Sequence, residues 1–236
     1  MMQVIGSSHA DRLSVGVRSL DLLPQNPGVT MSDLSQALQN RTVWLICRDQ
    51  PADDDILLGA AETAIRPASR TQYERLRRGM PEPDTATMQF WTSPARRAQQ
   101  TASRLIPEVR WQSGEHVGPR LWGAWQGLTW PEVRSRDALR AEAFWSDFGA
   151  ARPPDGESLQ DVMERWTLFA TALGHQPDWR TVLVVTHPDV IRVAVCQILD
   201  VRLSNAGRIH IAPLSMTRAS VSFLGWRLDD LNVRAT

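Results

Sequence analysis

Two short apolar runs stand out in the hydropathy pattern of this 236-residue chain. Residues 43–47 and 182–185 are consecutively apolar, without alternating polar positions. Continuous runs of this length are typical of strands that are covered on both faces, as in parallel sheets. The segment 88–91, which contains one polar residue, predicts another strand.

Helical patterns alternate with these strands. The longest covers residues 158–173, where Leu159, Val162 and Trp166 recur at a spacing of three to four residues. The alternation predicts a three-layer α/β/α sandwich around a mostly parallel central sheet. Three further helices are predicted, at residues 71–78, 95–105 and 188–199.

The pattern also divides the chain into regions. Residues 1–40 are polar and weakly patterned, with a short helix predicted at 31–38, and we interpret them as an N-terminal extension. Residues 41–236 are expected to form one domain. Within it, residues 107–156 are rich in Trp, Pro and Gly, and we expect an irregular, lid-like insertion over the carboxyl edge of the sheet.

Composition narrows the classes of partner. The chain has 26 basic and 26 acidic residues, so no overall field attracts it to nucleic acid or to an anionic membrane. No segment approaches the roughly 20 apolar residues of a membrane span. Cys47 and Cys196 lie in apolar runs, which predicts buried thiols and a cytoplasmic protein. Whether it forms a homodimer is left open.

Charged or titratable side chains follow both apolar runs. Arg48 and Asp49 end the first, and His187 ends the second. Ligands of parallel sheets bind outside the carboxyl ends of the strands, so these residues are candidates for one site. Arg97 falls in the first turns of a predicted helix and could join them. Two guanidinium groups and an imidazole would form a cradle for a phosphate or carboxylate ligand.

Five motifs strengthen this interpretation, at residues 44–51, 92–102, 123–129, 155–159 and 184–192. In their order along residues 42–232, they resemble the histidine phosphatase superfamily, particularly the α-ribazole phosphatases and the cofactor-dependent phosphoglycerate mutases. The resemblance implies the phosphoglycerate mutase-like fold, and it implies that Arg48, Arg97 and His187 bind a phosphoryl group.

Two positions depart from the family pattern. Asp49 stands where the nucleophilic histidine of the family belongs, and Gln126 stands where its acidic glutamate belongs. An amide cannot donate a proton at neutral pH, so general-acid assistance is lost. The resemblance therefore implies that anion binding is retained, whereas ordinary phosphatase or mutase activity is expected to be very weak.

Three functional hypotheses follow for Asp49, Gln126 and His187 as the catalytic positions. The first is a pocket repurposed for other chemistry on an anionic small molecule, with Asp49 and His187 as an acid–base pair. The second is a non-catalytic ligand-binding or scaffold protein. The third is a weak phosphatase with Asp49 as nucleophile. No metal ion or cofactor is expected, because the acidic run at residues 53–55 is interpreted as a solvated loop.

Overall fold

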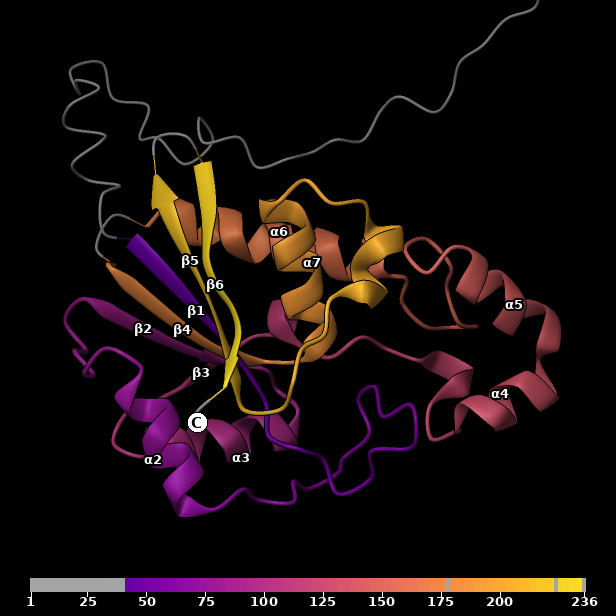
Figure 1. Cartoon of the computed structure of the whole chain (residues 1–236), viewed down its shortest axis with the longest axis horizontal. Helices are drawn as coiled ribbons and strands as arrows, with labels where there is room; N and C mark the ends of the chain where they lie inside the picture. Colours follow the sequence, from indigo (N-terminus) through magenta and orange to yellow (C-terminus); the bar gives the residue numbers. More distant parts are fainter. Residues whose placement is uncertain (1–40, 177–178, 223–224, 235–236) are drawn as a thin grey trace, which may run out of the picture.

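A mixed sheet of six strands forms the centre of the structure, a computed structural model that describes residues 41–176, 179–222 and 225–234 (Figure 1). The strand order is β3-β2-β4-β1-β5-β6. The predicted extension at 1–40, with its helix at 31–38, lies outside the described residues. The strands are β1 (Arg41–Cys47), β2 (Met88–Thr92), β3 (Gln112–Ser113), β4 (Thr181–Thr186), β5 (Ser215–Ser222) and β6 (Gly225–Arg234).

The parallel part of the sheet brings the two apolar runs together. β1 pairs in parallel with β4, so that Cys47 lies opposite Thr186 at their carboxyl ends. β2 and β3 continue the parallel pairing, whereas β5 and β6 are antiparallel. The predicted mostly parallel sheet is confirmed. The antiparallel pair was not predicted, because the half-exposed residues of β6 form no apolar run.

Helices cover both faces of the sheet, which confirms the predicted three layers (Figure 1). Val43, Leu45 and Cys47 of β1 share a core with two helices on one face, and Ile46 shares a core with two helices on the other. The first pair is α6 (Leu159–Gly174) and α7 (Pro188–Ile198), and the second is α2 (Arg70–Arg78) and α3 (Arg96–Leu105).

Serine caps fix where two of these helices begin. Ser69 before α2 and Ser158 before α6 each accept a hydrogen bond from the third helical amide, and the residue at that position bonds back to the serine amide. This reciprocal arrangement satisfies two donors that a helix end otherwise leaves unpaired.

The region 107–156 is more regular than expected. It contains β3, two short 3₁₀ turns, η2 (Glu115–Val117) and η3 (Gly123–Trp125), and two helices, α4 (Trp130–Arg136) and α5 (Ala138–Ser146). The prediction of an irregular insertion is therefore wrong for residues 130–146. Their stability comes from an aromatic core with Trp125 and Phe144, and from a Thr129 capping box, rather than from an apolar stripe.

The helices α4 and α5 extend to the side of the sheet in Figure 1, and the loop that precedes them approaches the carboxyl edge. A final 3₁₀ turn, η4 (Leu203–Arg208), connects α7 toward β5. Within the described part of the chain, no helix is both long and apolar enough to span a bilayer.

Candidate functional site

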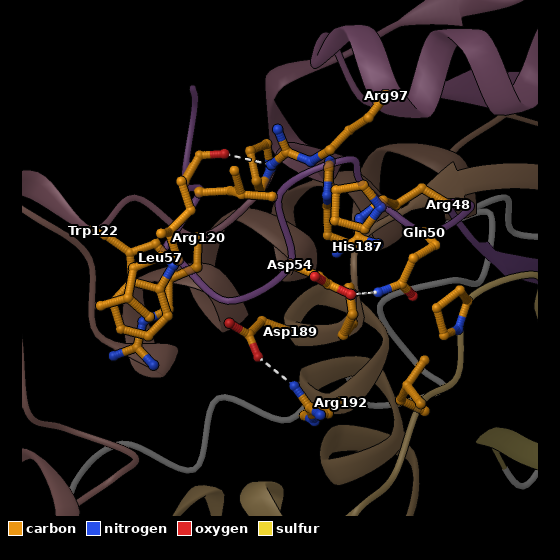
Figure 2. A pocket seen from close by; sticks show the side chains of 18 residues that line it. Arg48, Gln50, Asp54, Leu57, Arg97, Arg120, Trp122, His187, Asp189 and Arg192 are labelled. Carbon is orange, nitrogen blue, oxygen red and sulfur yellow. Dashed lines mark hydrogen bonds and ion pairs between the residues drawn. The ribbon is translucent and has the colours of Figure 1, made fainter. Parts of the chain in front are cut away.

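A cavity of about 300 Å³ lies at the carboxyl ends of β1 and β4 (Figure 2). Its walls come from the loop after β1, the first turn of α3, the loop before η3 and the start of α7. The charged and titratable residues on these walls are Arg48, Arg97, Arg120, Arg192, Asp54, Asp189 and His187.

Arg48 leaves the end of β1 directly into the cavity. Its backbone amide donates to the Thr186 carbonyl at 2.8 Å, which extends the β1–β4 pairing by one residue. Its Nη1 donates to the Asp49 carbonyl at 3.0 Å, and its buried Nε has no partner in the described residues. Burial lowers the pKa of this guanidinium. A buried donor without a partner costs free energy, so this geometry favours binding of an acceptor beside the Arg48 Nε.

Arg97 is the inward-facing arginine of α3. Its side chain is 2% exposed, whereas the neighbouring Arg96 is exposed to solvent. The Arg97 guanidinium donates to the carbonyls of Ala61, at 3.0 Å, and Gly59, and its Nε is buried without a partner in the described residues. Burial, and then the charge of Arg48, lowers the pKa of Arg97 to about 10. The two guanidinium groups therefore face one region of the cavity.

His187 forms the third wall of this region. It occupies the N-cap position of α7, is 4% exposed, and places Nε2 at 2.7 Å from the Ser93 hydroxyl oxygen. Burial, followed by the charges of Arg97 and Arg48, lowers the pKa of His187 well below its ordinary value. The ring is therefore neutral near pH 7, with one nitrogen that donates and one that accepts.

Asp49 does not line this cavity. Its carboxylate is 3% exposed and accepts hydrogen bonds from the Gln50 amide at 2.7 Å, the Ala68 amide at 2.7 Å and the Tyr73 hydroxyl at 2.9 Å. Its own amide donates to the Thr101 hydroxyl at 2.9 Å. These contacts turn Asp49 toward α2 and α3. The structure thus does not bring it together with His187, because three convergent donors hold the carboxylate elsewhere.

Gln126 is also outside the cavity. Its side chain is exposed, and its Oε1 accepts a hydrogen bond from the Ala60 amide at 3.2 Å. This contact holds the η3 loop against the loop after β1. Of the five predicted site residues, the structure brings together Arg48, Arg97 and His187, and it separates Asp49 and Gln126 from them.

Several cavity residues were not predicted as part of the site. Asp189 forms an ion pair with Arg192 at 2.8 Å. Their i, i+3 spacing, directly after His187, is typical of a pair on one helix face and could have predicted this contact. Asp54 accepts a hydrogen bond from Gln50. It belongs to the acidic run that was interpreted as a solvated loop.

No pattern in the sequence indicated that Arg120 lines the cavity. It is 2% exposed and donates to the carbonyls of Glu157 at 2.8 Å and Ala151 at 3.1 Å. Its guanidinium lies 4.9 Å from the Trp122 ring centre and 4.8 Å from that of Phe144. Arg120 thus joins the cavity wall to the aromatic core of α4 and α5.

The cavity is electropositive. Four arginines against two aspartates leave two positive charges in excess, which suits a phosphate dianion. In the part of the chain that the structure describes, no group of three or more His, Cys, Asp or Glu side chains is arranged to hold a metal ion. The chemistry that this arrangement favours is anion recognition by arginine.

Comparisons with known proteins agree with this fold. Residues 49–234 match the profile of the histidine phosphatase superfamily (branch 1). The α-ribazole phosphatase from Shigella flexneri has the same fold, with a TM-score of 0.72 at 19% identity, over 82% of this chain and 97% of that one. A mycobacterial glucosyl-3-phosphoglycerate phosphatase, solved with inorganic phosphate, has a TM-score of 0.69 at 26% identity, over 83% and 98% of the two chains.

Curated relatives are similar over shorter stretches. A 6-phosphofructo-2-kinase/fructose-2,6-bisphosphatase from Caenorhabditis elegans is 29% identical over 137 residues, which cover 58% of this chain and 29% of that protein. The phosphoglycerate mutase of Schizosaccharomyces pombe is 28% identical over 112 residues, or 44% of this chain and 53% of that protein. The chain thus spans only part of the length of these relatives.

Proposed function

This chain belongs to the histidine phosphatase superfamily, and we propose that it binds a phosphomonoester or similar anion between Arg48, Arg97 and His187 without forming a phosphohistidine. One observation carries the proposal. Among the histidines of the described residues, only His187 lines the cavity, and Asp49 occupies the strand end with its carboxylate turned away.

Anion binding is supported by the unsatisfied donors. The Nε atoms of Arg48 and Arg97 are buried without protein partners in the described residues, and a phosphate oxygen would satisfy such donors. A neutral His187 adds a hydrogen-bond donor to the two arginines without a third charge to desolvate. The related mycobacterial phosphatase, which was solved with inorganic phosphate and also with VO3, makes the same class of ligand a reasonable expectation here.

Loss of phosphoryl transfer is supported by the two departing residues. A covalent intermediate needs a nucleophile that can reach the phosphorus atom. To reach the cavity, Asp49 would have to give up hydrogen bonds to Gln50, Ala68 and Tyr73. This geometry argues against both an aspartyl nucleophile and an acid–base pair with His187. A ligand-binding protein is the function that the site supports best.

Calorimetric titration with phosphate and with vanadate tests the binding site. Arg97→Ala should weaken binding at least tenfold, because a charge-assisted hydrogen bond contributes about 1.5–3 kcal/mol. Arg96→Ala is the matched control, since Arg96 is the exposed neighbour on the same helix, and it should bind as wild type does. Arg48→Ala provides an independent variant, and thermal melting checks that each is folded. Equal affinity in Arg97→Ala and wild type would show that the cradle is wrong.

An aryl phosphate assay tests the loss of turnover. The wild type should hydrolyse the substrate no faster than background. Robust wild-type turnover that His187→Ala abolishes would contradict the proposal. A double variant, Asp49→His with Gln126→Glu, restores both family residues, and turnover confined to this variant would locate the loss at these two positions.

A further inference from the structure

We infer that the outer face of helix α5 binds a second copy of this chain, with Trp145 of each copy seated in a groove on the other. This face lies outside the cavity at the carboxyl ends of β1 and β4, so the inference goes beyond the proposed function. It is carried by the exposure of Trp145, by the groove beside it and by two opposite charges that line this groove.

Trp145 is an exposed aromatic residue whose ring is held in position. It is 56% exposed, and Leu139 on the same helix is 83% exposed. The Trp145 ring stacks on the Phe148 ring, with centres 5.7 Å apart and planes 13° apart, and its centre lies 4.9 Å from that of Trp130. A side chain that is already ordered loses little entropy on binding, so burial of its exposed surface favours association.

A groove of about 590 Å³ lies beside Trp145. Helices α4 and α5 project from the side of the sheet, which leaves their outer surface accessible to another molecule (Figure 1). At about 30 Å³ per water molecule, the groove would hold roughly twenty waters, and one indole side chain occupies much less. The residues that line it include small side chains and the two charges, and they are Arg134, Ala138, Ala141, Glu142, Trp145 and Ser146.

Arg134 and Glu142 bring opposite charges to the groove. Within the described residues, neither forms a salt bridge, whereas the nearby Arg136 and Arg140 pair with carboxylates close to them in the chain. In a two-fold dimer, residue i of one copy contacts residue j of the other, and j contacts i. One arginine and one glutamate in the same groove therefore allow two reciprocal ion pairs between copies. A partner that carried charges of one sign would meet a like charge here, so a second copy fits this surface best.

The expected dimer is weak and depends on concentration. Stable protein interfaces bury about 1,200–2,000 Å² in total, whereas one helix face with a single tryptophan from each copy buries less. We expect a dissociation constant of roughly 10–100 µM, which sedimentation velocity of the full chain over a concentration series measures. A protein that stays monomeric up to about 1 mM would overturn the inference.

Trp145→Ala tests whether this face is the one that associates. The variant should dimerise at least about tenfold more weakly, because buried tryptophans contribute a large share of the binding free energy at interfaces. Leu168→Ala, which removes another large exposed side chain, 62% exposed on α6, is the control and should dimerise as wild type does. Thermal melts check that both variants are folded. A dimer that Trp145→Ala leaves unchanged, or that Leu168→Ala weakens equally, would overturn the assignment to this face.

Two charge reversals test the reciprocal ion pairs without altering the aromatic core. Arg134→Glu and Glu142→Arg both change exposed residues, so the fold should be kept. Each variant alone should dimerise at least about tenfold more weakly, because both ion pairs become contacts between like charges. An equimolar mixture of the two variants should recover dimers, because the two glutamates of one chain then face the two arginines of the other. A mixture that stays as weak as either variant alone would contradict the proposed arrangement.

Discussion

The hydroxyl group of Tyr73 donates a 2.9 Å hydrogen bond to the carboxylate of Asp49 and thereby joins helix α2 to the end of strand β1. Tyr73 is 5% exposed, and burial raises its pKa, so the hydroxyl remains a donor throughout the physiological range. Asp49 also accepts the Ala68 amide at 2.7 Å. Asp49 thus contributes contacts that hold the end of β1 to α2.

Tyr73→Phe should destabilise the protein. The substitution leaves a buried carboxylate with one donor fewer, which lowers the free energy of unfolding by about 1–3 kcal/mol. Urea unfolding measures the change, and phosphate affinity should be unaffected. In an Asp49→Asn background the same substitution should cost less, because the charged acceptor is gone. Equal costs in the two backgrounds would mean that the tyrosine acts through packing alone.

Acid should destabilise the ligand-free protein through His187. Its folded pKa lies well below 6.5, the ordinary value that applies in the unfolded chain, because burial and the nearby arginines disfavour the charged ring. The unfolded state therefore binds more protons below pH 6.5, and stability is lost as the pH falls, by up to about 1.4 kcal/mol per pH unit. Unfolding free energies between pH 7 and 5 measure the slope.

Two glutamine variants test whether His187 causes this dependence of the unfolding free energy on pH. His187→Gln should flatten it, because the titrating group is removed. His175→Gln changes an exposed histidine at the end of α6 and should leave it as in wild type. The assignment to His187 fails if its removal leaves the acid sensitivity unaltered.

Arg120→Leu should lower the free energy of unfolding by about 2–4 kcal/mol. The substitution leaves the Glu157 and Ala151 carbonyls without their arginine donor and removes the cation from the Trp122 and Phe144 rings. Denaturant unfolding checks the value. Arg134→Leu, at an exposed position on α4, should change stability by less than about 0.5 kcal/mol. Similar losses in both variants would contradict the anchoring role.

Gly123→Ala and Gly127→Ala form a matched pair in the η3 loop. Both glycines have positive φ, at 50° and 81°, a region that costs an alanine about 1–2 kcal/mol. A Cβ at Gly123 would also lie 2.0 Å from the Pro154 carbonyl oxygen, whereas a Cβ at Gly127 would have no atom within 4 Å. Gly123→Ala should therefore be much the more destabilising in thermal melts. Equal melting temperatures would show that this loop can move away from residue 154.

Much of the fold could be predicted from local patterns. Residues 43–47 and 182–185 are apolar throughout because both faces of β1 and β4 are covered, and this property is visible along the chain. The antiparallel strands and the helices α4 and α5 were missed. Most residues of β6 are half-exposed, β5 buries the polar residues Ser215 and Thr217 within its core positions, and α4 and α5 form an aromatic core across short elements. None of these segments has a periodic apolar pattern that predicts it.

The sequence by itself determined that Arg48 and His187 share one edge of the sheet, because each directly follows a buried strand and parallel strands end together. Only the tertiary structure decided that Asp49 turns away from that edge, while Asp54, Asp189 and Arg120 reach the cavity. The physical reason is that the direction of a side chain depends on the donors that surround it in space. For Asp49 these are Ala68 and Tyr73, which lie about twenty residues away in the chain.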